Sequence, residues 1–250
     1  MKKDAKKSEI DVMGNYKLKS YLYGLKKAIP VIFGFLPVAI SFAILAGNAG
    51  LNMAETVAMS AFVFAGASQI MSVELIAGGA QMISIVIATF VINLRHIIMS
   101  TCVFKRLQKG SVFTRLLEGF GITDETFALF TTENEKNCNS AFLLGLITVT
   151  YSSWVIGTLI GTLVSVMLPS IISDSFGIAL YALFISLIVP DVKKNSRLFI
   201  TVAITAIMNA ILCFMIDKSW AIIISTLLGA FLGVFIVEDE DSESESEVAV

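Results

Sequence analysis

The sequence predicts an all-helical, polytopic membrane protein with six to seven spans, and three observations lead to this class. Of its 250 residues, 56% are hydrophobic and 15% are charged, whereas a soluble domain is about half apolar and about a quarter charged. The mean hydropathy is +0.83. The apolar residues also stand in long runs, because Ala28–Gly47 has 20 residues without a charge and Ala141–Leu168 has 28. A bilayer span needs roughly 20 apolar residues, so these runs are predicted to cross a membrane.

The first 27 residues form a basic segment ahead of the first span. The segment lacks the apolar stretch of a cleavable signal peptide and contains Lys2, Lys3, Lys6, Lys7, Lys17, Lys19, Lys26 and Lys27. Lysine just before a first span keeps that end of the chain in the cytoplasm. Residues 1–27 are therefore predicted to be cytoplasmic. Residues 16–27 suit either a short amphipathic helix on anionic headgroups or a solvated topology signal.

Seven apolar segments follow and make up a predicted transmembrane transport domain, 28–237. They are residues 28–47, 54–78, 82–103, 141–168, 176–190, 198–216 and 220–237. A polar stretch, 105–140, separates the third segment from the fourth. Residues 238–250 are an acidic tail that contains E-D-E-D-S-E-S-E-S-E. The tail is predicted to be disordered because it lacks apolar residues to bury.

The charge pattern leaves the number of crossings open. Seven simple crossings from a cytoplasmic N-terminus would put two basic loops outside, against the positive-inside rule. Their basic residues are Lys105, Arg106, Lys109, Arg115, Lys193, Lys194 and Arg197. If segment 54–78 instead dips into the membrane and returns, both loops and the tail become cytoplasmic. This segment ends at Gly78-Gly79 and contains a polar break, and non-helical backbone at membrane depth is tolerated where it is buried or lines a cavity.

An inverted repeat of segments one to three and four to six is the alternative. Each triplet has a long apolar segment, then one with a polar break, then a third span. Three crossings per unit would invert the second unit, as in many transporters. Helix breaks are predicted at Pro37 and at Pro190-Asp191.

The third apolar segment carries an unusual polar trio in F-V-I-N-L-R-H-I-I-M-S, namely Asn93, Arg95 and His96. A charge at the centre of a span costs about 2.5–3.5 kcal/mol on insertion scales, and such residues usually face the protein interior and serve a pathway. Asn93 and His96 share a helix face, whereas Arg95 points elsewhere. The trio is therefore predicted to bridge two neighbouring segments and to serve the transport pathway or proton coupling, since histidine can change charge near neutral pH.

The second segment contains Gly66-Ala67-Ser68-Gln69 and, further on, Glu74. The small residues suit close helix packing. They also suit a broken helix whose free N–H groups hold a carboxylate, with Gln69 binding a polar headgroup atom. We therefore predict that these four residues bind substrate, with Phe62, Phe64 and Ile70 as apolar neighbours. Glu74 is a candidate for the pathway or for proton coupling.

The polar stretch contains G-F-G-I-T-D-E-T-F, in which Thr123 or Asp124 is suited to cap a short helix. A gate or proton-handling role for Asp124 and Glu125 is the other interpretation of the same residues. Both interpretations stay open at the sequence level.

Motifs of enzymes and metal sites are missing from the sequence. It contains no G-x-x-x-x-G-K-[ST], H-E-x-x-H, G-x-S-x-G or dinucleotide-binding glycine pattern. One histidine excludes a multi-histidine metal site, and Cys102, Cys138 and Cys213 have no ligand spacing. We therefore expect no enzymatic activity, no catalytic residues, no cofactor, no metal and no nucleic acid partner.

Four motifs in this order resemble the AzlC family. They are G-F-L-P at 34–37, F-A-G-A-S-Q at 64–69, N-L-R-H at 93–96 and T-D-E-T-F at 123–127. The resemblance covers residues 25–235 and excludes the lysine-rich start and the acidic tail. It implies the large subunit of a bacterial two-component exporter in the cell (inner) membrane. The implied partner is a small AzlD-type membrane subunit, the implied substrates are leucine, isoleucine, valine and analogues, and the implied energy source is the proton motive force.

Two other function classes remain open: a transporter or channel for another small solute, and a membrane assembly subunit without a transport path. The G-x-x-x-G motif of Gly157 and Gly161 offers a packing face either within this chain or for the partner subunit. A short, very apolar protein encoded next to this chain would favour the exporter.

Overall fold

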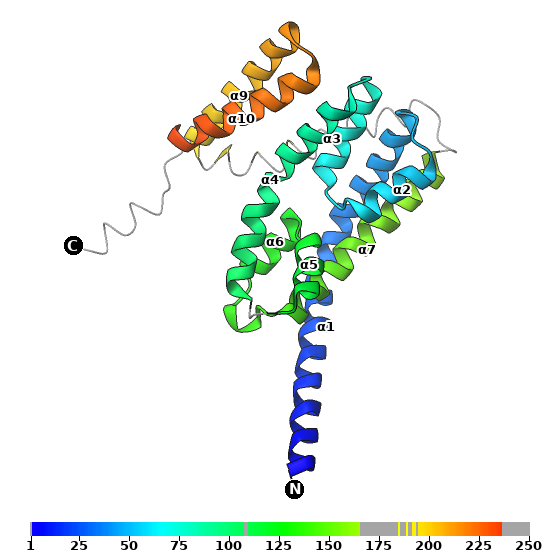
Figure 1. Ribbon diagram of the computed structural model, residues 1–250, viewed down its shortest axis with the longest axis vertical. Coiled ribbons are helices and arrows are strands. Elements are labelled where there is room, and N and C mark those ends of the chain that lie inside the picture. The colour runs from blue at the N-terminus through cyan, green and yellow to red at the C-terminus, as the bar shows by residue number, and fades with distance from the viewer. Residues whose placement is uncertain are drawn as a thin grey trace, which may run out of the picture. The chain divides into compact units, whose positions relative to one another are not determined.

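The computed structural model describes residues 2–107, 110–165, 185, 189, 192, 193 and 195–236, with side chains from Gly14 onward except that of Ser219. The described elements are all helical (Figure 1). They are α1 (Lys2–Asn48), α2 (Met53–Phe62), α3 (Gly66–Ala77), α4 (Met82–Arg106), α5 (Val112–Phe120), α6 (Asp124–Thr131), the 3₁₀ turn η1 (Glu135–Asn137), α7 (Ser140–Ser165), α9 (Ser196–Met215) and α10 (Lys218–Ile236). The all-helical class predicted from the sequence is confirmed.

Four described helices are long and apolar enough to cross a membrane. They are residues Gly14–Asn48 within α1, then α4, α7 and α9, and Trp220–Ile236 is a shorter apolar helix. The predicted segment 176–190, the break at Pro190-Asp191 and the tail from residue 238 lie outside the described residues. The predicted six to seven spans and the inverted repeat therefore stay predictions.

The first span belongs to a helix that is longer than the sequence suggested. α1 continues through Pro30 and Pro37, so the helix break predicted at Pro37 is not observed. A proline inside a helix removes one hydrogen bond and often only kinks it. The hydroxyl of Ser41 donates to the Pro37 carbonyl at 2.8 Å, which adds a bond within the turn that follows the proline.

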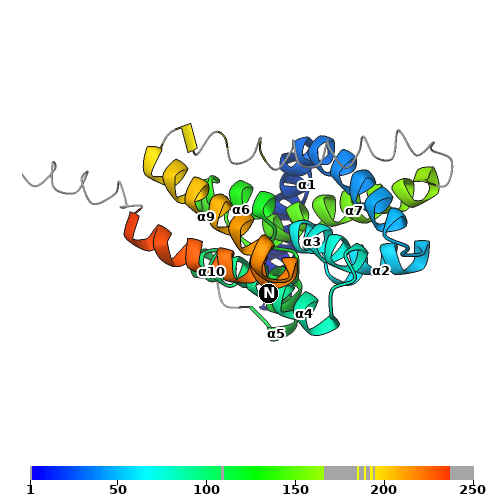
Figure 2. The same cartoon turned by 90° about the horizontal axis from the view of Figure 1, so that it is seen from above.

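The chain divides into two compact units, Met1–Glu74 with Asn93–Gly177, and Leu75–Ile92 with Ile178–Val250. In the first unit, α1 and α7 lie side by side (Figures 1 and 2). A Cβ atom added to Gly157 would lie 2.8 Å from Ala39 Cβ, and one added to Gly161 would lie 2.7 Å from Ala43 Cβ. The contacts advance in the same direction along both helices, so α1 and α7 are parallel. The G-x-x-x-G motif is thus used within the chain.

One end of the first unit gathers basic residues, and we call it the basic end. Lys27 Nζ lies 3.2 Å from Glu133 Oε2, and Arg106 Nη1 donates to the Thr131 carbonyl at 2.7 Å. These contacts place the middle of α1, at Lys27, and the C-terminus of α4 beside the segment between α6 and α7. At the opposite end, a Cβ atom on Gly47 of α1 would lie 3.7 Å from Ser165 Oγ of α7.

Two pairs of short helices complete the first unit. α2 has 10 residues and α3 has 12, which makes them about 15 and 18 Å long. α5 has 9 residues and α6 has 8, or about 14 and 12 Å. None of the four reaches across a hydrocarbon core of about 30 Å. The single apolar segment predicted at 54–78 is therefore two half-length helices.

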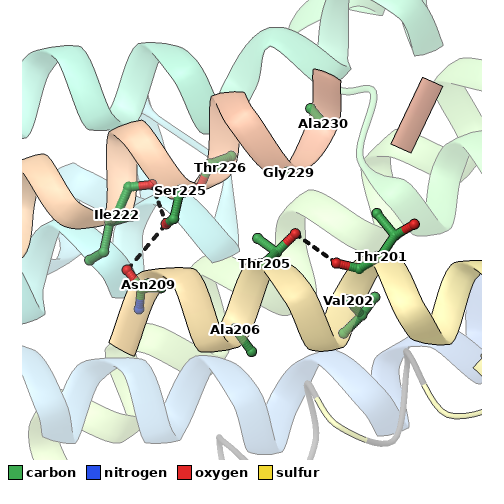
Figure 3. Close-up of a pocket in the computed structure, with 10 residues that line it drawn as sticks. All are labelled: Thr201, Val202, Thr205, Ala206, Asn209, Ile222, Ser225, Thr226, Gly229 and Ala230. Carbon is green, nitrogen blue, oxygen red and sulfur yellow. Dashed lines mark hydrogen bonds between the residues drawn. The ribbon is translucent and has the colours of Figure 1, made fainter. Parts of the chain in front are cut away.

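In the second unit, α9 and α10 form an antiparallel pair. A Cβ atom on Gly233 would lie 3.4 Å from Thr201 Cγ2, and one on Gly229 would lie 2.6 Å from Thr205 Cγ2. Ser225 Oγ donates to Asn209 Oδ1 at 3.2 Å. A groove of about 480 Å³ runs between these helices, with the side chains of Thr205, Asn209 and Ser225 along it (Figure 3).

Candidate functional site

The helix break predicted in the second apolar segment lies between α2 and α3. α2 begins with a capping box in which Asn52 and Glu55 exchange backbone-to-side-chain bonds of 3.0 and 2.8 Å. α2 ends at Phe62, and Phe64 has a φ of +45°, a backbone conformation that non-glycine residues rarely adopt. α3 then begins at Gly66.

Gly66 is needed at this point because an indole ring lies against its backbone. A Cβ atom added to Gly66 would lie 2.8 Å from Trp154 Cη2 of α7, which is too close for ordinary van der Waals contact. Trp154 is itself buried, with 4% of its surface exposed. The start of α3 is thus fixed against the middle of α7.

Gln69 is fully buried and its amide is bonded at both ends. Its Oε1 accepts from the Ala65 backbone N–H and from Trp154 Nε1, each at 3.1 Å. Its Nε2 donates to Ser60 Oγ at 3.2 Å, and Ser60 Oγ lies 2.7 Å from Thr158 Oγ1. One amide therefore connects α2, α3 and α7 across the break. In this conformation both polar atoms of the Gln69 amide are hydrogen-bonded to other groups of the protein.

The polar trio of α4 reaches two neighbours, but Arg95 and His96 both contact the α5–α6 region, whereas the helical spacing had grouped His96 with Asn93. Asn93 Nδ2 donates to Ser68 Oγ at 3.1 Å, and Ser68 Oγ donates to the Ala65 carbonyl at 2.9 Å. Arg95 Nη1 lies 2.9 Å from Asp124 Oδ2. His96 Nδ1 lies 2.9 Å from the Ile122 carbonyl.

The protonation of His96 follows from its partner. A carbonyl oxygen only accepts hydrogen bonds, so Nδ1 carries the hydrogen. His96 Nε2 is buried and has no partner among the described residues, and the same holds for Asn93 Oδ1 and Arg95 Nε. Unpaired buried polar atoms are costly, so these three atoms are candidates for contact with a bound solute or water.

The Arg95–Asp124 pair is half exposed, with 40% and 50% of the two side chains accessible. Arg95 stands 11 positions before Arg106, which places it about 16 Å along α4 from the basic end. Because charges within a span rarely face lipid, we expect the exposed side of this pair to face a wet cavity or another protein.

Aromatic rings join the α2–α3 break to the turn between α5 and α6. The ring centroids of Phe64 and Tyr151 are 5.1 Å apart, and both rings lie 6.0 Å from that of Phe120. Tyr151 also donates to the Ala61 carbonyl at 3.0 Å. We call Phe64, Phe120 and Tyr151 the aromatic trio.

The other predicted site residues lie around this centre. Thr123 is the N-cap of α6, so the capping role predicted for Thr123 or Asp124 falls to Thr123. Glu125 follows Asp124 and is half-buried. Glu74 lies in α3, five positions beyond Gln69, and is half-buried.

Several residues of the centre were not predicted from the sequence. Trp154, Ser60 and Thr158 complete the Gln69 network, and Glu118 is fully buried. Glu118 Oε2 pairs with Arg115 Nη1 at 3.1 Å, while its Oε1 has no partner among the described residues. A tryptophan far from either end of an apolar run is one available signal, because its N–H needs an acceptor when buried.

Comparison with known proteins places the chain in a family. The sequence pattern of a family described as AzlC protein matches residues 30–168, which is more than half of the chain. An uncharacterized membrane protein of Archaeoglobus fulgidus is 34% identical over 175 residues, covering 68% of this chain and 75% of the relative. Inner membrane protein YgaZ of Escherichia coli is 27% identical over 208 residues, covering 79% and 83%.

An uncharacterized membrane protein of Helicobacter pylori is 25% identical over 182 residues, covering 72% of this chain and 79% of the relative. No solved structure matches the chain. The chain therefore belongs to the AzlC family and is a multi-pass inner membrane protein like YgaZ, in a family linked to branched-chain amino acid transport.

Proposed function

We propose that the chain is the large subunit of a two-component secondary transporter that exports leucine, isoleucine, valine and analogues. AzlC-family proteins are generally transporter subunits rather than enzymes, which supports this class. The observation that carries the proposal is the broken helix at Phe64–Gly66, with its polar network and the unpaired atoms of α4 opposite. Broken helices at mid-membrane are the usual substrate sites of secondary transporters.

The substrate carboxylate binds at the N-terminus of α3 in this proposal. The backbone N–H groups of Gly66, Ala67 and Ser68 are the first of the helix and lack carbonyls one turn earlier to bond. Together with the helix dipole they favour an anion. Asn93 Oδ1 is a free acceptor beside Ser68 and suits the substrate ammonium. Gln69 would contact the headgroup only by exchanging one of its present bonds, and otherwise it keeps the break in shape.

The branched side chain lies against apolar neighbours of the break. Phe64 and Ile70 are buried at 2% and 4% exposure, whereas Phe62 is 81% exposed. Phe62 is therefore not among the neighbours that we propose for the substrate. Apolar walls distinguish one methylene by only about 1–3 kcal/mol, so several branched or similar amino acids are accepted.

Proton coupling uses the polar groups of α4 and α6 in this proposal. His96, Arg95, Asp124 and Glu125 stand together at the α4–α6 contact, and Glu74 is a further candidate. His96→Gln is expected to alter the pH dependence of export. Unchanged export rate and unchanged pH dependence in this variant would exclude His96 from coupling.

A transport assay tests the proposed function. The chain and its small partner subunit are placed in vesicles, and movement of radiolabelled leucine is measured with and without an imposed proton gradient. Accumulation against a leucine gradient is expected only when protons flow. Equilibration without accumulation would indicate a channel. If neither leucine, isoleucine nor valine moves when both proteins are present, the proposed exporter function is refuted.

A further inference from the structure

The α5–α6 pair leaves the basic end and returns to it. α5 follows Leu107, whose carbonyl accepts from Arg115 Nη2 at 3.4 Å. α6 ends at Thr131, whose carbonyl accepts from Arg106 at the end of α4. The hairpin of 9- and 8-residue helices therefore starts and finishes on one side of the first unit.

The tip of this hairpin lies far from the basic end. Phe120 contacts Tyr151, the twelfth residue of α7, which is about 16 Å from the start of that helix. Gly121 packs so closely on α7 that an added Cβ atom would lie 2.6 Å from Ile147 Cδ1. The Ile122 carbonyl bonds His96. About 16 Å is half of a hydrocarbon core of about 30 Å, so with the start of α7 at the membrane boundary the tip reaches the mid-plane.

The side chains of α5 are arranged for lipid rather than for water. Val112, Phe113 and Leu116 are 78%, 71% and 67% exposed. Glu118 is fully buried, and its partner Arg115 is 21% exposed. A helix within a membrane turns its apolar side chains outward and its charged side chains inward. A surface helix in water has the opposite arrangement.

A second hairpin, α2–α3, begins beyond the opposite end of α1, at Asn52. Its tip residue Phe64 contacts Phe120 at the tip of α5–α6. The two tips therefore meet at the aromatic trio, beside the proposed substrate site.

We propose that α5–α6 is a re-entrant hairpin that enters the membrane from the basic end and gates the transport path on that side. The aromatic trio is the closed barrier between the two hairpins. Arg95 and His96 are positioning residues that hold the tip shut through Asp124 and the Ile122 carbonyl. The gating part rests on the proposed transport function, whereas the re-entrant placement does not.

We call the Arg95–Asp124 ion pair and the His96–Ile122 hydrogen bond the latch, and its contacts are of a kind that can break. Its ion pair is half exposed, and exposed pairs are held weakly. The α1–α7 contact is different, because glycines bring its two backbones together over several turns. The proposed motion has to separate Ile122 and Phe130 from the buried cluster that they share with Phe142 and Leu146 of α7, while α1 and α7 stay packed.

Cysteine labelling tests the placement in a chain whose Cys102, Cys138 and Cys213 have been replaced. Ser111→Cys and Leu116→Cys are treated with a membrane-impermeant maleimide in vesicles of both orientations, with Lys19→Cys and Asn48→Cys as references for the two faces. Ser111→Cys is expected to react from the same face as Lys19→Cys. Leu116→Cys is expected to react at least tenfold more slowly, because it faces lipid. Equal rates at positions 111 and 116, or reaction of Ser111→Cys from the face of Asn48→Cys, would overturn the re-entrant hairpin.

Crosslinking tests the gate. The pair Gly121→Cys/Ile147→Cys joins the tip to α7, because a Cβ atom on Gly121 would lie 2.6 Å from Ile147 Cγ1. The control pair Ala39→Cys/Gly157→Cys joins α1 to α7, because a Cβ atom on Gly157 would lie 2.8 Å from Ala39 Cβ. Oxidation of the tip pair is expected to stop leucine export and a reductant to restore it, while the control pair keeps its export rate under oxidation.

The crosslinking result separates the gate from the proposed function. Undiminished leucine export after crosslinking of the tip pair would overturn the gate but leave the exporter standing. If the parent chain with its partner moves no branched-chain amino acid, the exporter and with it the gating part fail. The labelling result then still decides whether the hairpin enters the membrane.

Discussion

Gln69 shows how one buried amide can hold a broken helix in place. It joins α3 to Ser60 and Trp154 and bonds the Ala65 N–H at the break. The sequence predicted a residue in contact with substrate, and this role stays a prediction. The structure adds a bracing role, because each polar atom of the amide already has a protein partner.

We expect Gln69→Ala to remain in the membrane but to lose most export and thermal stability. The change leaves the Ala65 and Trp154 donors without an acceptor, and a buried unsatisfied group costs about 1–3 kcal/mol. Leucine and valine export should fall equally, because the headgroup is common to both. The measurements are abundance-matched export and unfolding temperature in detergent, with Gln81→Ala, an exposed glutamine, as control. A variant with parental export of both substrates would contradict the prediction.

Gly66→Val should also lower export, because its side chain would meet the Trp154 indole. Gly34→Val is the matched control, since nothing lies within 4 Å of a Cβ atom at Gly34. Both proteins are compared for membrane abundance, unfolding temperature and leucine export. Equal losses in the two variants would show that close contact with Trp154 is not the cause.

Glu133 at the basic end is expected to make the stability of the protein depend on pH. Its carboxylate accepts from Asn137 at 2.9 Å and also bonds Lys27 and Tyr23. These bonds lower the pKa of Glu133 from 4.5 to about 2. The folded state therefore prefers the charged form, so the contribution to stability is complete above pH 4.5 and is lost as the pH falls through about 2.

Glu133→Gln should thus lower the unfolding temperature by a constant amount down to about pH 5. The difference from the parent should shrink only below that pH. Thermal unfolding in detergent from neutral pH to about pH 3 checks this, with the exposed Glu135→Gln as control. A difference that vanishes already between pH 7 and 5 would contradict the lowered pKa.

At the scale of the helices, some features follow from consecutive residues in the sequence, and others depend on contacts between distant segments. Long apolar runs predicted the spans in α1, α4 and α7 because hydropathy is a property of consecutive residues. Helical spacing predicted that Asn93 and His96 share a face and that Arg95 points elsewhere, whereas Arg95 and His96 both reach the α5–α6 region and Asn93 reaches α3. By contrast, the α5–α6 hairpin lies in the stretch 105–140, whose sequence is polar. Arg115 and Glu118 raise its polarity in sequence, but they neutralise each other in the fold.

The continuation of α1 through Pro37 could not be predicted from local rules either. Packing along α7 stabilises the helix on both sides of the proline, and tertiary contacts override local preference. The partners of Gln69 were also out of reach, because Trp154 lies 85 positions away. Such pairing depends on how parallel helices pack rather than on a local pattern.

The Arg95–Asp124 contact between α4 and α6 predicts how easily a reagent reaches the tip of α5–α6. Arg95→Ala should speed maleimide labelling of Ile122→Cys, which is buried at the tip, because the Asp124 contact is lost. Arg95→Lys should restore slow labelling in part, since it keeps the charge but not the planar geometry. Lys105→Ala on the same helix is the control and is exposed. Equal labelling in all variants would mean that Arg95 does not hold the hairpin.

For the molecule as a whole, the half-exposed Arg95–Asp124 pair supports a second subunit or a wet path beside α4. We expect full export only when a small AzlD-type protein is present together with this chain. Export of leucine is compared for the chain alone, the small protein alone and both together. Full activity of the chain alone, at matched abundance, would contradict the need for a partner.

In the proposed arrangement, two half-depth hairpins that meet at the aromatic trio would also shape the electric field. Where water fills the spaces above and below the tips, the membrane voltage falls mainly across the thin layer of Phe64, Phe120 and Tyr151 instead of across about 30 Å of hydrocarbon. A charge that passes this layer then feels nearly the whole voltage, about 2.3 kcal/mol per elementary charge for each 100 mV. A zwitterionic amino acid has no net charge, so the voltage would act on a coupled proton and leave the substrate itself untouched.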